Sequence, residues 1–264
     1  MVSDVLGTRG DGADPSHALP MLRRYFRAVL GDQLVGDRLA RAVWEDIPDA
    51  AKAAAPAPLF GAAMRAWRRA ALAPPARPFS TRNLLATIPP AATLPRQVGV
   101  LIDVFGLTVG EAAAALDRSE GEVVRLLAAT RGERDAALDA DVLIVEDDAL
   151  IAQHLATVVR AKGARSVTVA HSYAKALQAA AQRPPQIAVC DYNLGPGPNG
   201  VDLVRHLTTE HDTICLFVTA YPDEVLQGTD GEPAFVLSKP FAAARLEAAL
   251  HYAARAPRPA LLAA

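Results

Sequence analysis

The chain has 264 residues, about half of them hydrophobic, and a formal net charge of −2 at pH 7. This length exceeds one small domain and suits two. The nearly balanced charge provides no bulk attraction to nucleic acid or to an anionic membrane surface. No apolar run approaches the roughly 20 residues of a membrane span, and the first 16 residues lack a signal-peptide core. We therefore expect a cytoplasmic protein.

Helical patterns fill the first half of the chain. A lead-in of 16 residues, which we expect to be flexible, precedes three segments with the apolar period of one helix face, at about residues 20–30, 36–47 and 59–72. The first segment also carries a group of basic residues, which we expect to form a solvated helix face: Arg23, Arg24 and Arg27. We assign residues 17–73 to one helical subdomain.

A proline-rich stretch at residues 74–93 is predicted to be a linker. Beyond it, Gly106 is a predicted helix C-cap, and Thr108 with Glu111 has the spacing of a capping box. A second capping box is predicted at Ser119 and Glu122, opening a helix that we expect to end at Gly132. This order of helices and turns predicts a helix-turn-helix over residues 94–137, completing a helical domain over residues 1–139.

Residues 140–264 alternate short apolar runs with helical patterns. The runs lack the alternation of a half-exposed strand, as is typical of strands buried on both faces of a parallel sheet. They lie at residues 142–145, 187–190, 216–218 and 234–237. We therefore predict a doubly wound α/β domain with a parallel sheet.

Polar residues follow these four runs. They are Glu146 and Asp147 after the first run, Asp191 after the second, Thr219 after the third and Lys239 after the fourth. Chemistry in such sheets collects beyond the carboxyl ends of the strands, so we expect the five side chains to converge. Asp148 stands where a helix should begin and is interpreted as its N-terminal residue.

This constellation resembles the receiver domain of two-component response regulators, from about residue 141 to residue 254. The resemblance implies a flavodoxin-like sheet of five strands and a regulator in place of an enzyme. It also implies that Asp191 accepts a phosphoryl group, since a carboxylate can act as a covalent nucleophile. Lys239 would place its charge on a phosphoryl oxygen, and Thr219 would donate its hydroxyl to the same group.

Clustered carboxylates at such a site require a divalent cation, and Mg²⁺ prefers oxygen ligands. We expect Asp147 and Asp191 to be direct ligands, and Glu146 to act directly or through water. The resemblance adds the backbone carbonyl of Asn193 to the ligand set.

One position departs from the receiver pattern. Receivers usually carry Tyr or Phe three residues before the lysine, and this chain has Val236 there. Tyr221, two residues after Thr219, either replaces that switch aromatic or is a loop aromatic packing on a helix.

The polar segment 228–231, after a short fourth helix, is where we expect contact with the helical half.

The helical half resembles extracytoplasmic-function sigma factors. Residues 94–134 are similar to region 4, on Leu107 to Ala113 and Ser119 to Val123, and residues 19–72 are more weakly similar to region 2. The predicted recognition helix nevertheless begins with Glu120 and Glu122, whose carboxylates would repel phosphate.

The order of a sigma-like half followed by a receiver resembles the PhyR family of general stress response regulators in alphaproteobacteria. The resemblance implies that a sensor histidine kinase or a phosphotransfer protein causes phosphorylation of Asp191. The sigma-like half is then released, binds a NepR-like anti-sigma factor and frees a sigma factor. The alternative is a response regulator that binds promoter DNA directly through its helix-turn-helix, which the acidic start of that helix disfavours.

Overall fold

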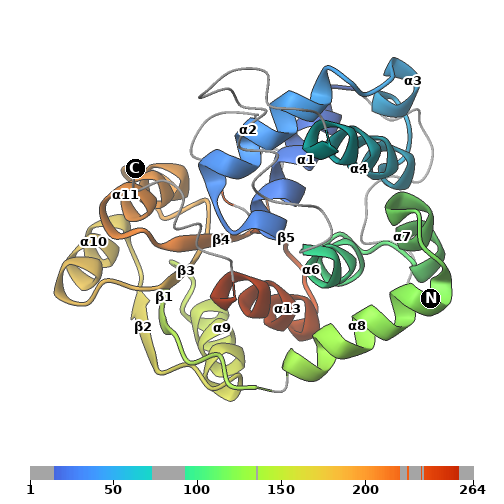
Figure 1. Ribbon diagram of the computed structural model, residues 1–264. Coiled ribbons are helices and arrows are strands. Elements are labelled where there is room, and N and C mark those ends of the chain that lie inside the picture. Colours follow the sequence, from blue (N-terminus) through green and yellow to red (C-terminus); the bar gives the residue numbers. More distant parts are fainter. Residues whose placement is uncertain are drawn as a thin grey trace.

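The structure, a computed structural model, describes residues 15–72, 93–134, 136–220, 225, 233 and 235–255. The described part of the first half is helical, as predicted (Figure 1). Its elements are α1 (Pro15–Leu30), α2 (Gln33–Trp44), α3 (Asp49–Lys52), α4 (Pro56–Leu72), α6 (Leu94–Gly99), the π-helix η2 (Val100–Val104), α7 (Val109–Leu116) and α8 (Glu120–Arg134). Most of the predicted linker and of the lead-in lies outside the described residues.

The second half contains a parallel sheet of five strands in the order β2-β1-β3-β4-β5, which confirms the predicted doubly wound fold. The strands are β1 (Asp141–Val145), β2 (Ser166–Ala170), β3 (Ile187–Cys190), β4 (Ile214–Thr219) and β5 (Phe235–Ser238). Helices α9 (Ala149–Ala161) and α13 (Ala243–Ala254) cover one face, and α10 (Tyr173–Gln182) and α11 (Gly200–His211) cover the other (Figure 1). Because both faces are buried, alternate residues of β1 enter different hydrophobic clusters, and the sequence run is apolar throughout.

The helix ends test the predicted caps. Thr108 and Glu111 form the complete capping box that the sequence predicts. At the start of α8, the Ser119 hydroxyl accepts the Glu122 amide at 3.2 Å, but the Glu122 carboxylate lies 3.6 Å from Arg118 and no return bond to Ser119 is found in this described segment. The helix also continues past Gly132 to Arg134, so its predicted end was two residues early.

Helix α1 begins at Pro15, earlier than the start predicted near residue 20. Proline is favoured at the first position of a helix, because its missing amide would have no partner within the helix there. Pro15 occupies that position in the structure, and Pro20 lies inside the helix.

The arginines of α1 do not form the solvated face that we expected from the sequence. Arg23 and Arg27 are 1% and 0% exposed, and both donate to Asp37 of α2. The closest atoms are 2.9 Å apart for Arg23 and 2.5 Å apart for Arg27. Gly36 permits this pairing, because a Cβ there would lie 2.6 Å from the Arg27 backbone nitrogen.

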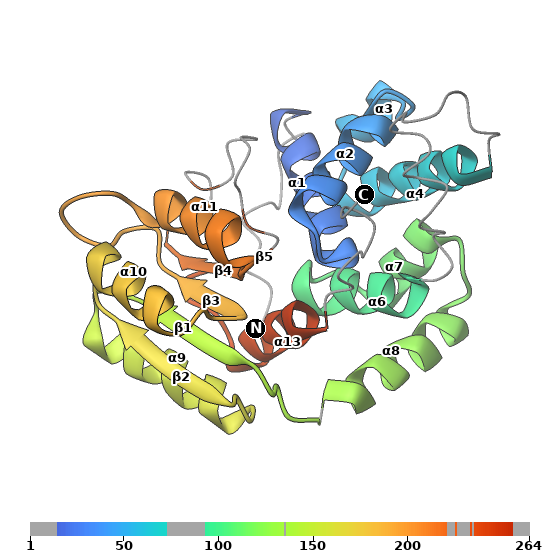
Figure 2. The same ribbon diagram turned by 60° about the vertical axis from the view of Figure 1, so that its left-hand side comes forward.

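The two halves share a continuous hydrophobic core, which runs from α1 and α4 through α13 to one face of the sheet. Figure 2 shows α13 between the sheet and the helical half. Helix α1 also contacts the edge strand β5: the Arg24 guanidinium donates to the Val236 carbonyl at 3.1 Å. The segment 228–231, where we expected contact, lies outside the described residues. Among the described helices, none is long and apolar enough to cross a membrane.

We expect Asp37→Ala to lower the free energy of unfolding by about 3–5 kcal/mol, because it leaves two buried guanidinium groups without their carboxylate. Urea denaturation followed by circular dichroism measures this loss. Asp49→Ala is the matched control, since the Asp49 carboxylate is 97% exposed and its pair with Lys52 should contribute less than about 1 kcal/mol. Equal losses in the two variants would contradict the burial argument.

Candidate functional site

The ends of β1 and β3 bring the acidic residues together. Val145 pairs with Cys190 in the parallel register, so the residues that follow them, Glu146 and Asp191, leave the sheet at the same level. Cys190 of β3 also pairs with Phe217 of β4, and Thr219 ends β4 two residues after Phe217. The ends of these strands therefore lie side by side at one edge of the sheet, as the sequence predicts.

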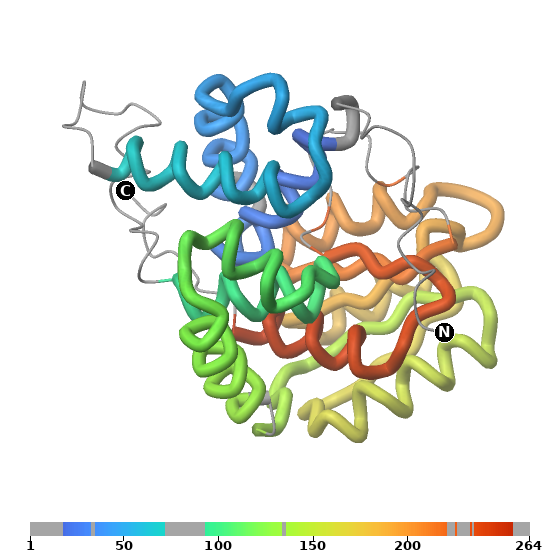
Figure 3. Tube along the Cα trace, turned by 90° about the vertical axis from the view of Figure 1, so that its right-hand side faces the viewer, coloured from blue at the N-terminus to red at the C-terminus, as the bar shows by residue number. Residues whose placement is uncertain are grey.

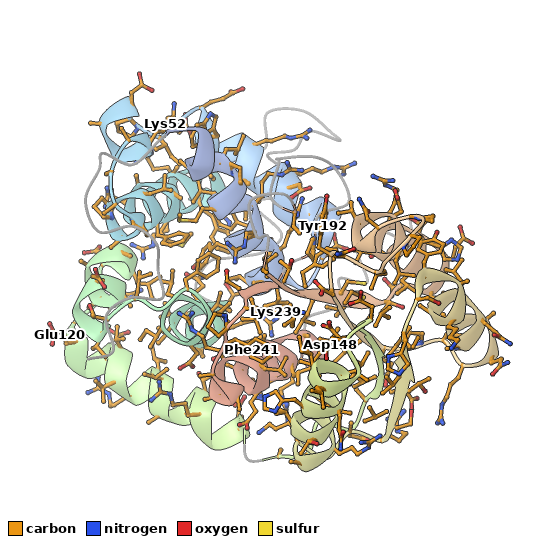
Figure 4. All side chains as sticks on the ribbon, turned by 180° about the vertical axis from the view of Figure 1, so that it is seen from behind. Lys52, Glu120, Asp148, Tyr192, Lys239 and Phe241 are labelled. Carbon is orange, nitrogen blue, oxygen red and sulfur yellow. The ribbon has the colours of Figure 1, made fainter. Side chains whose placement is uncertain are left out.

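Lys239 supplies a positive charge to this edge. Its Nζ lies 2.8 Å from Glu146 Oε2 and 2.8 Å from Asp191 Oδ2, so one ammonium bridges two carboxylates. Figure 4 shows Lys239, Tyr192 and Asp148 at this edge, with Glu120 far from them on α8. The Lys239 amide also donates to the Thr219 carbonyl at 2.8 Å, which holds the ends of β4 and β5 together.

The three acids form a candidate cation site. Carboxylate oxygens of Glu146, Asp147 and Asp191 all lie within 4.8 Å of one another, and Asp147 is exposed while Glu146 is buried. A set made only of carboxylate oxygens, open to solvent on one side, fits a hard cation that keeps part of its water shell.

Burial raises the pKa of the Glu146 carboxyl to about 7, and repulsion from Asp191 and Asp147 acts in the same direction, while Lys239 opposes it. Burial would lower the pKa of Lys239, but its hydrogen bonds to Asp191 and Glu146 outweigh this and raise the pKa above its usual value. Lys239 thus pairs with two of the three clustered acids in the described part of the site.

Two further groups contact the acidic residues, and neither was predicted from the sequence. The Tyr192 amide donates to Asp191 Oδ1 at 2.6 Å, which leaves Oδ2 for Lys239. A backbone amide carries no sequence signal. His171 follows β2 and its Nδ1 lies 2.9 Å from the Glu146 carbonyl oxygen; its place after a strand was the signal that could have identified it.

The other residues predicted from the sequence differ in their burial and in their distance from the acids along the chain. Thr219 is fully buried at the end of β4. Asn193 lies two residues beyond Asp191 in an exposed loop, where its side chain accepts the Gly195 amide at 3.2 Å. Tyr221 lies outside the described residues. Asp148 is the N-cap of α9 and accepts the amides of Leu150 and Ile151, as predicted.

Comparisons with known proteins agree with this geometry. The family model of the response regulator receiver domain matches residues 142–251, and that of the sigma2 domain of PhyR matches residues 16–58. The phyllosphere-induced regulator PhyR of Methylorubrum extorquens is 31% identical over 245 residues, covering 89% of this chain and 91% of that protein.

Solved structures of PhyR proteins also match over nearly the whole chain. The response regulator PhyR from Brucella abortus is 27% identical with a TM-score of 0.69, covering 90% of this chain and 91% of that one. The anti-anti-sigma factor PhyR from Bartonella quintana is 24% identical with a TM-score of 0.71, covering 91% and 95%, and this likeness shows the fold alone.

A receiver sheet with its acidic edge, joined to a preceding sigma-like helical half, defines a response regulator. The match to the Methylorubrum protein, which extends over 89% of this chain, identifies the family within this class. The chain belongs to the PhyR family of response regulators.

We expect the metal-free protein to lose stability between pH 5 and pH 7 because of Glu146. The folded pKa of about 7 lies above the ordinary 4.5, so the folded protein keeps a proton that the unfolded chain releases in this range. The contribution is full below pH 4.5 and falls as pH rises to 7, by at most about 1.4 kcal/mol per pH unit.

Urea denaturation at several pH values in the presence of a chelator measures this slope. Glu146→Gln should remove it, whereas Asp148→Asn, at the exposed start of α9, should keep it. Parallel pH curves for Glu146→Gln and the unsubstituted protein would show that Glu146 is not the group responsible.

Proposed function

We propose that this protein is a phosphorylation-controlled switch whose receiver, over residues 140–264, covers a sigma-like domain over residues 1–139. Phosphorylation of Asp191 releases the sigma-like domain, which then binds an anti-sigma factor of the NepR type and frees a sigma factor for stress-response transcription. A PhyR protein from Bartonella quintana is described as an anti-anti-sigma factor, and membership of the same family supports this reading.

One observation carries the proposal: the strand that leads to the charged site also contacts the sigma-like half. Lys239 follows β5, and the carbonyl of Val236 on β5 accepts the Arg24 guanidinium of α1 at 3.1 Å. Only two residues therefore separate Lys239, which responds to charge at Asp191, from Val236, which is bound by the sigma-like half. A shift of this strand would change both.

The chemistry assigned to the site follows from its charges. The Asp191 carboxylate is the acceptor, because it is held at the edge of the sheet by Tyr192 and Lys239. The acyl phosphate would carry about −1.5 to −2 charges in place of the single negative charge of the Asp191 carboxylate, and its oxygens would compete with Glu146 for the Lys239 ammonium. The Thr219 hydroxyl would donate to the same group.

Glu146, Asp147, Asp191 and the carbonyl of Asn193 would hold Mg²⁺, which when bound neutralises negative charge on the acids and on the incoming phosphoryl group. The donor set of hard oxygen atoms supports this ion. The proposed phosphoryl source is a sensor histidine kinase or a phosphotransfer protein, and the proposed place of action is the cytoplasm.

We expect Asp191→Asn to abolish labelling by acetyl phosphate in the presence of Mg²⁺, since the amide is not a nucleophile toward phosphorus. Phosphate-affinity electrophoresis with mass spectrometry of the modified peptide detects the label. Asp148→Asn is the matched control, because that carboxylate caps α9 and asparagine also caps helices, so labelling should persist. Labelling of Asp191→Asn at another residue would contradict the site assignment.

We expect the phosphorylated protein to bind the anti-sigma factor at least about tenfold more tightly than the unmodified protein, because only an open fraction of the latter can bind. Isothermal titration calorimetry with and without a phosphoryl donor measures the difference. Lys239→Ala should take up the donor's phosphoryl group poorly and show no such increase. Equal affinity in both states of the unsubstituted protein would exclude the covering mechanism.

A further inference from the structure

Tyr252 of α13 belongs to the receiver but is enclosed by the helical half. Its side chain is 1% exposed, and its hydroxyl donates to Asp103 of η2 at 3.2 Å. The guanidinium carbon of Arg96, on α6, lies 5.5 Å from the centre of its ring. Figure 3 shows α13 running alongside the helical half, so this residue lies at the contact between the two parts.

Gly99 provides the space that the Tyr252 hydroxyl occupies. A Cβ atom at Gly99 would lie 1.9 Å from the Tyr252 Oη and 2.7 Å from its Cζ, both far inside van der Waals contact. The ring cannot easily move aside, because its hydroxyl is held by Asp103 and its surroundings are buried. Position 99 therefore has room for the hydrogen atom of glycine but not for a methyl group.

The backbone at Gly99 gives no other reason for glycine. It has φ −64° and ψ −42°, an ordinary right-handed helical conformation in which alanine is the better helix former. A glycine inside a helix therefore costs stability in the helical half itself. The close approach of Tyr252 is the feature that accounts for it.

The groups around this contact connect it to both parts of the molecule. Arg96 donates to three carbonyls: Ala28 at the end of α1 at 2.8 Å, Arg255 at 3.0 Å, and Tyr252. Asp103, whose side chain is 6% exposed, also accepts Arg131 of α8 at 2.7 Å. One tyrosine thus lies where α6, η2, α8 and α13 are joined.

We propose that Tyr252, packed into the space left by the missing side chain of Gly99, forms the autoinhibitory lock of this protein, and that one methyl group at position 99 opens it without phosphorylation. This inference rests on the proposed function, in which separation of the halves exposes the sigma-like domain. Gly99→Ala obstructs the docking of α13 while favouring the helix in which it lies. The substitution should therefore open the contact between the two halves without unfolding the helical half.

The test uses the full-length chain without a phosphoryl donor. Small-angle X-ray scattering gives the radius of gyration, about 18 Å for a compact chain of this length. Gly99→Ala should increase it and should raise anti-sigma affinity roughly tenfold or more, as expected when a closed state loses its population advantage. Gly132→Ala is the matched control, because a Cβ at Gly132 of α8 meets nothing within 4 Å. Its radius and affinity should equal those of the unsubstituted protein.

Tyr252→Phe is a second variant, which removes only the hydroxyl and its bond to Asp103. It should open the molecule less than Gly99→Ala, and circular dichroism should show native helix content in both. A compact Gly99→Ala protein, with the radius of the control, overturns the lock whatever its affinity. An expanded Gly99→Ala protein that does not bind the anti-sigma factor keeps the lock and refutes the proposed function.

Discussion

The position of one ammonium group underlies the rest of the structure. Lys239 lies 2.8 Å from both Glu146 and Asp191, and burial, with repulsion from Asp191 and Asp147, keeps the pKa of Glu146 raised in spite of this ammonium. A site in this condition responds strongly to added charge, because partly buried charges are poorly screened by solvent. Lys239 is also covalently continuous with β5, so a change in its partners acts on the edge strand of the sheet. The adjoining helix α1 is bound to that same strand.

The contact between α1 and β5 depends on a fixed orientation of α1. Buried ion pairs are seldom a net source of stability, since the desolvation of both groups offsets their attraction, but they fix geometry when every group is paired. Asp37 holds Arg23 and Arg27 on one side of α1 and thereby fixes the orientation of the helix. Arg24, next along the helix, is then positioned at β5, with its guanidinium carbon 5.3 Å from the centre of the Phe105 ring. We interpret the buried ion pairs as the support for this contact.

The sequence predicted the features that depend on local pattern. Non-alternating apolar runs, polar residues after them and the capping box at Thr108 all appear in the structure, because strand burial, sheet edges and helix caps have short-range signatures. The arginines of α1 could not be predicted in the same way. Their burial depends on Asp37, and on a glycine that lets α2 approach α1, and neither partner is marked by helical periodicity. Gly99 is a similar case, since its partner Tyr252 lies in the other half of the chain.

The kinds of contact between the two halves also determine the free energy that holds them together. Several of its polar contacts are made by arginine side chains to backbone carbonyls, as at Arg24 and Arg96. Both groups can regain water when the halves separate, so each such bond contributes only about 1 kcal/mol to closure. A ligand or modification shifts a two-state equilibrium only by its difference in affinity for the two states. Under the proposed function, the charge change at Asp191 must therefore outweigh these hydrogen bonds, the fit of Tyr252 against Gly99 and the hydrophobic core that the two halves share.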